Sequence, residues 1–188
     1  MEILLPTENW ISEMRLITRN RKSDGSIRNK FVDIFVSGLS MEQQETISKS
    51  QVVIELKVIS MLGLNSGRRK KVEKKIDYNS LREINNELKT KSEDDLLKMD
   101  YCYFCLEKNN YQFVTIQTIL DDAIKQINSY IELLKEGRVS DSKVKVVDAL
   151  DDIVILGGWV IMSLGSERIL TRKIGFKKIY HKFEFILP

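Results

Sequence analysis

The stretch that decides the fold covers residues 51–59 and reads Gln-Val-Val-Ile-Glu-Leu-Lys-Val-Ile. Its length and its β-branched residues indicate a strand. Successive side chains point to opposite faces of a strand, so Glu55 and Lys57 share one face while the apolar residues between and beside them point the other way. A buried charge is costly unless it is paired or coordinates an ion, so this pair predicts a partner or a bound ion on its face.

A second carboxylate lies in the strand-like run Phe-Val-Asp-Ile-Phe-Val that surrounds Asp33. Two carboxylates and a lysine that meet on adjacent strands would form a site for a hard divalent cation and a phosphate. The ordinary alternatives are a turn or salt bridge for Asp33 and a solvated outer strand face for Glu55 and Lys57. Val53 and Ile59 share that face, which argues against a simply polar one.

The clearest helix is expected over residues 117–136, with Thr118 as its N-cap and Gly137 as its stop. Its inward face is apolar except at Gln126 and Tyr130, which are one turn apart. Buried polar side chains need hydrogen-bond partners, so these two predict something polar in front of the helix. A structural hydrogen bond to the sheet is a nearly equal alternative.

The remaining patterns predict an α/β domain in which helices cover a sheet. The expected elements are an amphipathic helix over 8–20, a strand from about 30 to Gly38, a polar connector over 40–50 with room for one helical turn, helices over 78–90 and 92–99, a β-hairpin over 100–116, and C-terminal strands near 153–162, 168–173 and 177–187. Glycines in the run 153–162 predict a bend or two elements there. With 188 residues, the chain is expected to form a single domain over 1–188.

The net charge is only +3, but the positive charge is concentrated in two clusters. Arg19, Arg21, Lys22, Arg28 and Lys30 form one, and the other is called the basic cluster below. The basic cluster comprises Arg68, Arg69, Lys70, Lys71, Lys74 and Lys75. Such a cluster can contact phosphates or act as a nuclear-localisation patch, and a solvated charged face is the common alternative.

Cysteine usage and hydropathy point to an intracellular protein. Cys102 and Cys105 form a C-x-x-C pair without a second Cys/His pair, so reduced thiols are a better interpretation than a zinc site. No apolar stretch approaches the roughly 20 residues that cross a bilayer, and the first residues lack the pattern of a signal peptide. We therefore expect no membrane association.

Three elements of the chain, taken in order, resemble the signature of the PD-(D/E)XK nuclease superfamily. They are Asp33, the tripeptide Glu55-Leu56-Lys57, and Gln126 with Tyr130 in Gln-Ile-Asn-Ser-Tyr. The surrounding sequence also looks like nuclease-like domains attached to AAA-ATPase-like modules in fungal proteins and in some crinkler-type effectors. The resemblance covers roughly residues 8–175.

The resemblance implies a restriction-endonuclease-like fold, which is a mixed central sheet flanked by helices. Here a helical and hairpin insertion over about residues 63–116 would follow the E-x-K strand. The resemblance also implies a bound Mg²⁺ or Mn²⁺, held by Asp33, Glu55 and the backbone carbonyl of Leu56. Such hard cations prefer oxygen ligands, so this chemistry is reasonable on its own terms.

The same resemblance assigns roles to the other site residues. Lys57 would orient or activate the attacking water and offset charge on the phosphate. Gln126 and Tyr130 would line the same cleft. The implied function is a metal-dependent nuclease that acts on DNA, with RNA as the second substrate, within a larger ATPase-associated system. Two alternatives stay open: an inactive nuclease fold that only binds nucleic acid, and a domain that binds a protein partner. Homodimerisation is common where two strands are cut, but nothing in the sequence requires it.

Overall fold

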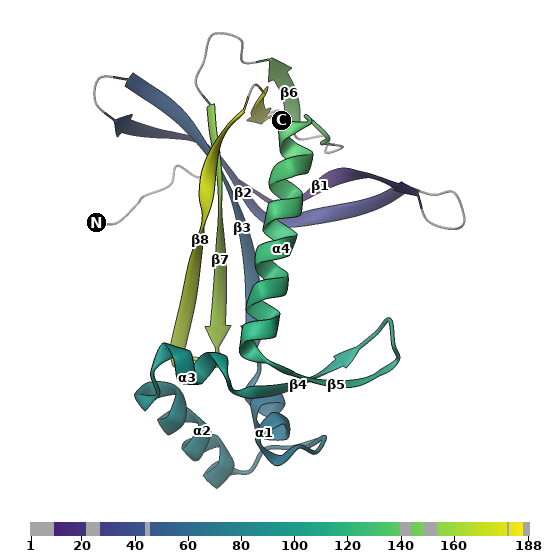
Figure 1. The fold of residues 1–188 in the computed structure, drawn as a ribbon, viewed down its shortest axis with the longest axis vertical. Helices are drawn as coiled ribbons and strands as arrows, with labels where there is room; N and C mark the ends of the chain where they lie inside the picture. Colours follow the sequence, from purple (N-terminus) through teal and green to yellow (C-terminus); the bar gives the residue numbers. More distant parts are fainter. Residues whose placement is uncertain are drawn as a thin grey trace. The chain divides into compact units, whose positions relative to one another are not determined.

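A computed structural model of the protein describes residues 10–21, 27–43, 46–139, 144–148, 154–179 and 181–185. Over these ranges the chain is α/β (Figure 1). The strands are β1 (Trp10–Arg21), β2 (Ile27–Gln43), β3 (Thr46–Ile59), β4 (Asp100–Cys105), β5 (Asn110–Thr115), β6 (Val144–Asp148), β7 (Val154–Leu164), β8 (Arg168–Ile179) and β9 (His181–Phe185). The helices are α1 (Met61–Arg69), α2 (Tyr78–Thr90), α3 (Glu93–Leu97) and α4 (Ile116–Lys135). None of these helices is long and apolar enough to cross a membrane.

The largest sheet has five strands in the order β1-β2-β3-β7-β8. The first three form an antiparallel meander. β3 and β7 are neighbours in this sheet. Their C-terminal ends meet: the N–H of Gly165, just beyond β7, donates a hydrogen bond to the carbonyl of Ile59, the last residue of β3, at 3.0 Å. These two strands therefore run in parallel. Gly165 then reverses the chain into β8 with a φ of 55°, so the sheet is mixed.

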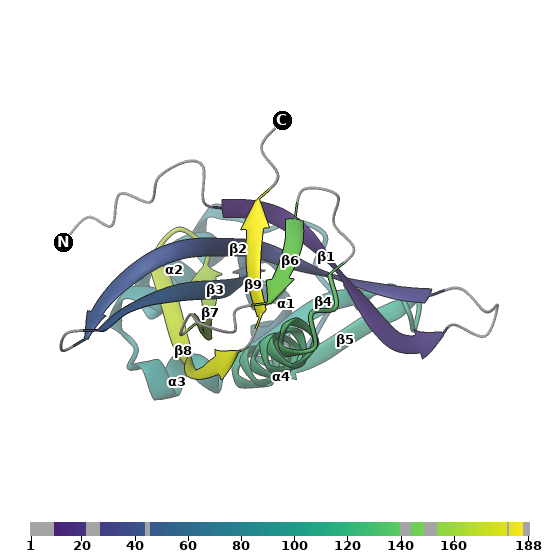
Figure 2. The ribbon, with the colours of Figure 1, turned by 90° about the horizontal axis from the view of Figure 1, so that it is seen from above.

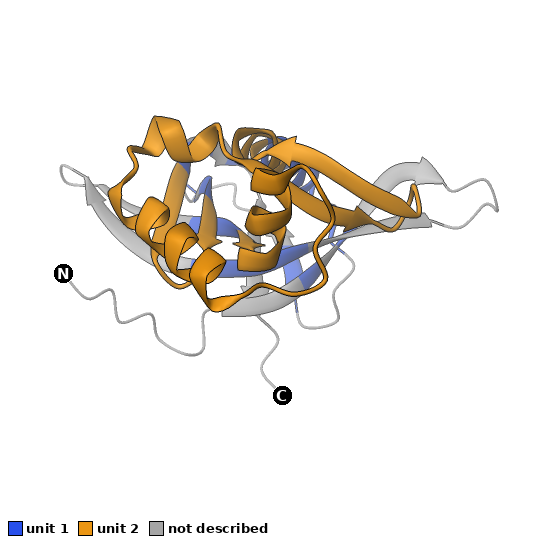
Figure 3. Ribbon diagram, turned by 90° about the horizontal axis from the view of Figure 1, so that it is seen from below, with its two compact units in different colours: residues 1–55, 125–159, 173–188 blue, residues 56–124, 160–172 orange. Residues whose placement is uncertain are grey.

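The chain divides into two compact units (Figure 3). Unit 1 comprises residues 1–55, 125–159 and 173–188, and unit 2 comprises residues 56–124 and 160–172. Unit 2 contains the whole of the segment that the sequence suggests as an insertion, 63–116. Four elements, β3, β7, β8 and α4, continue from one unit into the other.

Unit 1 has an apolar core between strands and the C-terminal part of α4. Its buried apolar residues include, on the strands, Met14, Leu16, Val32, Phe35, Val36, Val52, Val53, Val154 and Leu156, and, on α4, Ile127, Ile131 and Leu134. Gly158 of β7 lies directly against the helix, because a Cβ added there would be 2.5 Å from Cγ2 of Ile127. A separate two-stranded sheet pairs β6 with β9, which lie side by side in Figure 2.

Unit 2 is built from three capped helices and the β4–β5 hairpin. Each of these helices has an N-cap whose side chain accepts a hydrogen bond from a backbone N–H of the first turn. The N-caps of α1, α2 and α3 are Ser60, Asp77 and Ser92. α1 packs on β4 through Gly63 and Gly67, where an added Cβ would collide with Tyr101 or with the backbone of β4. Glycines four residues apart thus give one helical face a close approach to a strand.

Several expected elements are confirmed. Helices occur at α2 and α3, close to the predicted ranges 78–90 and 92–99, and α4 lies within one residue of the predicted range 117–136 at each end. The hairpin over 100–116 forms as β4 and β5. The N-cap of α4 was misplaced, because Oγ1 of Thr115, rather than Thr118, accepts a backbone N–H of the first turn.

The helix predicted over 8–20 is wrong: residues 10–21 form strand β1, while residues 8 and 9 lie outside the described ranges. Met14 and Leu16 are both buried, and their spacing of two is that of a strand. The pattern misled because Trp10 and Met14 are four residues apart, which places them on one face in either structure.

The connector predicted over 40–50 is also wrong. β2 does not stop near Gly38 but passes it through an irregularity between Ser37 and Leu39 and pairs with β3 as far as Gln43. Backbone hydrogen bonds hold this ladder, so polar side chains do not prevent it. The bend or break predicted at the glycines of residues 153–162 is also wrong, because β7 is a single strand through them. Gly158 instead allows close contact with Ile127 of α4. Helix α1 and strand β6 were not predicted.

Candidate functional site

The two predicted carboxylates lie on neighbouring strands of unit 1. β2 and β3 pair antiparallel with Ile34 opposite Ile54. The ladder ends at this pair; continued by one residue, its register would place Asp33 opposite Glu55. Residues in such a pair share a face of the sheet and have Cβ atoms about 5 Å apart. The sheet register therefore brings together two carboxylates that are far apart in the sequence.

Glu55 lies on the inner face of β3. Its side chain is only 1% exposed, whereas Val58, on the opposite face, is 76% exposed. Asp33 is half buried. The prediction that the charged face of this strand is not a solvated surface is therefore confirmed for Glu55. A buried carboxylate is retained only with hydrogen bonds, an opposite charge or a cation.

Helix α4 supplies Gln126 and Tyr130 to the same unit. The Gln126 Nε2 donates a hydrogen bond to the Tyr130 hydroxyl. The two side chains are one helical turn apart, so the same face presents both. Tyr130 is 2% exposed and is the largest fully buried side chain described. The polar interruption of this helix face is thus an internally bonded pair directed into the fold.

Tyr130 interacts electrostatically with both carboxylates. Burial raises the pKa of Tyr130 to about 12, the hydrogen bond from Gln126 lowers it, and the negative charges of Glu55 and Asp33 raise it further. The phenol therefore stays protonated at neutral pH and retains a hydrogen that it can donate. Asp33, Glu55, Gln126 and Tyr130, from β2, β3 and α4, form one cluster in unit 1.

Lys57 follows Glu55 by two residues on β3, so its side chain leaves the strand on the same face. It is half buried. Between them, Leu56 is 41% exposed and turns its side chain to the other face. Its backbone carbonyl is the third oxygen ligand expected from the sequence.

The donor set suits a hard cation. Carboxylates of Asp33 and Glu55 and a carbonyl of Leu56 are the oxygen ligands that Mg²⁺ and Mn²⁺ prefer. Within the described ranges, no group of three or more His, Cys, Asp or Glu side chains could hold a metal. A cation at this cluster would therefore have two carboxylates and complete its shell with carbonyl and water oxygens.

Cys102 and Cys105 are free thiols on β4, and burial raises the pKa of Cys102.

The basic cluster belongs to unit 2 and is half neutralised. Three of its members form ion pairs with acidic side chains. The pairs are Arg68 with Glu83 at 3.0 Å and Glu87 at 3.6 Å, Arg69 with Glu73 at 3.8 Å and Asp77 at 3.5 Å, and Lys70 with Asp100. Lys71, Lys74 and Lys75 are exposed, and no ion pair joins them to another described residue. The six residues are thus not equivalent as phosphate contacts.

Sequence patterns missed one exposed feature of unit 2. The β4–β5 hairpin carries aromatic side chains at Tyr103, Phe104, Tyr111 and Phe113 that remain on the surface. The signal was present in the alternation of Tyr101, Tyr103 and Cys105 and in the aromatic residues of both strands, which predicted the hairpin but not which side chains stay exposed.

No protein-family model, no curated protein and no solved structure matches this chain. Any functional proposal therefore depends on the residues described above: the carboxylates on β2 and β3, the lysine that follows Glu55 on β3, and the polar pair on α4.

Proposed function

We propose that the protein is a metal-dependent nuclease that hydrolyses phosphodiester bonds of DNA, with RNA as the alternative substrate. The observation that carries the proposal is that the charges of both Glu55 and Asp33 raise the pKa of the buried Tyr130. The β2–β3 register, continued one residue past the Ile34–Ile54 pair, would also place the two carboxylates opposite each other. The order of strand, strand, helix and parallel strand supports a restriction-endonuclease-like fold of the PD-(D/E)XK superfamily.

In this proposal Asp33, Glu55 and the Leu56 carbonyl hold Mg²⁺ or Mn²⁺. When bound, the cation polarises the phosphate and favours hydroxide over water. Lys57 orients the attacking water and offsets the negative charge that grows on the phosphate oxygens as the water adds. Its ammonium has this effect only because it leaves β3 on the same face as Glu55.

Gln126 and Tyr130 position the carboxylates. Because Gln126 donates to the Tyr130 oxygen, the phenol hydrogen is directed to an acceptor other than Gln126. Asp33 and Glu55 supply the negative charge nearby. A phenol that stays protonated can hold a carboxylate in one orientation without taking its proton.

Cleavage of plasmid DNA and of a labelled RNA, with Mg²⁺ or Mn²⁺ and with EDTA, tests the proposal. We expect cleavage that requires the cation and falls at least about 100-fold in Asp33→Asn and Glu55→Gln. Asp94→Asn is the matched control, because Asp94 is an exposed carboxylate on α3. Cation-independent cleavage, or equal rates in all three variants, would show that this cluster is not the catalytic site.

An inactive nuclease fold is the alternative outcome. It requires binding of nucleic acid or of a protein without turnover under every cation tested. Circular dichroism of the variants must match that of the wild type for either conclusion to hold.

A further inference from the structure

The β4–β5 hairpin exposes aromatic rings that the core of unit 2 does not use. Tyr103, Phe104, Tyr111 and Phe113 are between 39% and 49% exposed. Cys102, on the same hairpin, is buried. Clustered exposed apolar side chains on a protein surface mark an interaction site more often than isolated ones do. We call residues 100–115 the aromatic hairpin.

The register of the hairpin gathers three of the rings on one face. Phe104 pairs with Tyr111, and Phe113 pairs with Cys102. Because side chains alternate, Phe104, Tyr111 and Phe113 share that face. The rings of Phe104 and Tyr111 meet edge to face with centroids 5.2 Å apart. Tyr111 and Phe113 are two residues apart on β5, which separates them by roughly 7 Å, about twice the stacking distance of bases.

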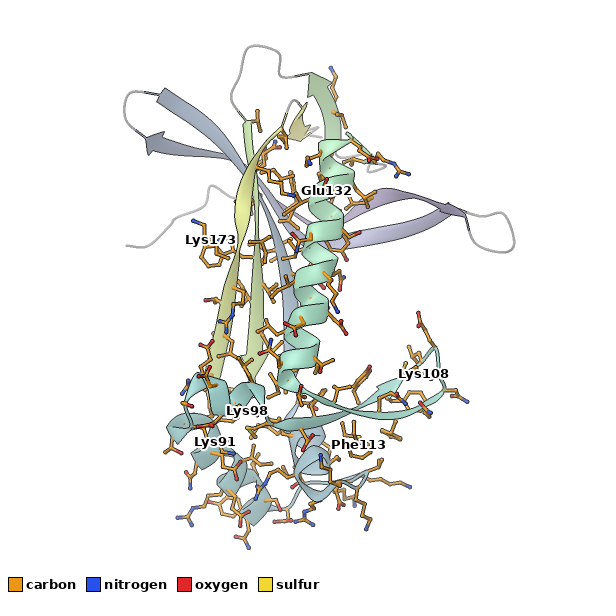
Figure 4. All side chains as sticks on the ribbon, viewed as in Figure 1. Lys91, Lys98, Lys108, Phe113, Glu132 and Lys173 are labelled. Carbon is orange, nitrogen blue, oxygen red and sulfur yellow. The ribbon has the colours of Figure 1, made fainter. Side chains whose placement is uncertain are left out.

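Positive charge accompanies these rings within unit 2. Lys70 forms an ion pair with Asp100, the first residue of β4, and so ties the end of α1 to the base of the aromatic hairpin. The residues that follow Lys70 in the sequence include three exposed lysines, Lys71, Lys74 and Lys75. Figure 4 shows Phe113 on the hairpin and Lys108 at its turn. Unit 2 thus carries both exposed aromatic rings and exposed lysines that form no ion pair with another described residue.

We propose that the aromatic hairpin and the lysines that follow α1 bind single-stranded nucleic acid. Bases stack on Phe104, Tyr111 and Phe113, and the backbone phosphates contact the lysines. A duplex hides the faces of its bases, so it cannot use these rings. Protein interfaces are depleted in lysine relative to other surfaces, and this combination therefore favours nucleic acid over a protein partner. The inference rests on the proposed function only for the kind of polymer that is bound.

Fluorescence anisotropy in EDTA tests binding apart from cleavage. The probes are a labelled single strand of about 16 nucleotides and the duplex of the same sequence. We expect the full chain to bind the single strand more tightly than the duplex. Tyr111→Leu and Phe113→Leu keep an apolar side chain but remove the ring, and each should weaken single-strand binding roughly fivefold or more. Tyr78→Leu is the matched control, because Tyr78 is a 75% exposed tyrosine on α2 of the same unit.

The lysines have their own readout. A Lys74→Ala/Lys75→Ala double variant should reduce the slope of log affinity against log salt by about 1.4 if both contact phosphates. Arg68→Ala is the control, because its side chain is already paired with Glu83, and it should change the slope less.

Several results would overturn the proposal. They are equal affinity for strand and duplex, wild-type affinity in both leucine variants, and an unchanged salt slope. A change in sedimentation of Phe113→Leu without a change in nucleic-acid affinity would instead assign the surface to protein association. Asp33→Asn separates the two proposals: it should abolish cleavage and retain single-strand binding, so failure of one leaves the other measurable.

Discussion

Asp33 of β2 and Glu55 of β3 each lie one residue beyond the Ile34–Ile54 pair, so the register continued by one step places them opposite each other. Like charges directly across two strands destabilise a sheet unless something compensates them. A cation is one such compensation, and it would bind more weakly if either carboxylate were lost. This pair is therefore the most direct place to test the structure in solution.

Mn²⁺ should raise the melting temperature of the wild type through this pair. A ligand at about 100 times its dissociation constant stabilises the fold by about 2.7 kcal/mol, which corresponds to about 5–10 °C for a chain of this size. We expect Asp33→Asn and Glu55→Gln to lose most of this rise, because an amide is a poorer ligand for a hard cation. Differential scanning fluorimetry measures it, and Asp94→Asn should keep the full rise. An undiminished rise in both amide variants would place the cation elsewhere.

Lys57→Ala should separate cation binding from catalysis. Lys57 leaves β3 beside Glu55 but is not a cation ligand, so the melting-temperature rise with Mn²⁺ should persist. Cleavage should fall by roughly 100-fold to 10,000-fold, the usual contribution of a positioned catalytic group. Single-turnover rates with saturating enzyme measure this effect. Parallel loss of the Mn²⁺ response would show that Lys57 supports the fold of the site instead of acting on the phosphate.

Tyr130→Phe should change how stability depends on alkaline pH. Burial and the charges of Glu55 and Asp33 raise the pKa of Tyr130 to about 12, against an ordinary value of 10. The folded state therefore favours the neutral phenol. This contribution is complete below pH 10 and is lost as the pH rises from 10 to 12. By pH 11.5 the loss is about 2 kcal/mol.

Urea unfolding in EDTA at pH 9 and pH 11.5 measures this effect. Other tyrosines and lysines titrate in the same range, so the informative quantity is the difference between the wild type and Tyr130→Phe. That difference should shift against the wild type at pH 11.5. A difference that is independent of pH would mean that the phenol titrates near its ordinary value.

Gly158→Ala should destabilise unit 1 by about 1–3 kcal/mol, because the new methyl group would lie 2.5 Å from Cγ2 of Ile127. Gly175→Ala is the matched control on β8, where an added Cβ meets no atom within 4 Å, and it should stay within about 0.5 kcal/mol.

Adding Ile127→Ala makes room for the new methyl group. The double variant should therefore lose less stability than the sum of the two single changes. Chemical denaturation of the four proteins measures the coupling, and strict additivity would contradict the close approach of α4 to β7.

The amino-acid sequence by itself determined the elements that depend on neighbouring residues. α2 and α4 follow the helical period of their apolar residues, and the aromatic hairpin follows its alternation and its turn. The same period of two placed Glu55 and Lys57 on one face of β3, which the structure retains.

Only the tertiary structure decided what depends on distant partners. Pairing with β2 makes residues 10–21 a strand although their apolar spacing also fits a helix. Close contact with β4 explains why α1 is rich in small residues. Acidic residues of α2, of β4 and of the segment between α1 and α2 form ion pairs with half of the basic cluster.

The register between β2 and β3 had the largest consequence. A shift of one residue would turn one carboxylate to the other face of the sheet. The sequence shows that Asp33 and Glu55 each lie in an apolar strand. Whether they meet depends on which residues pair across the ladder, and that is set by burial over the whole sheet, not by either strand alone.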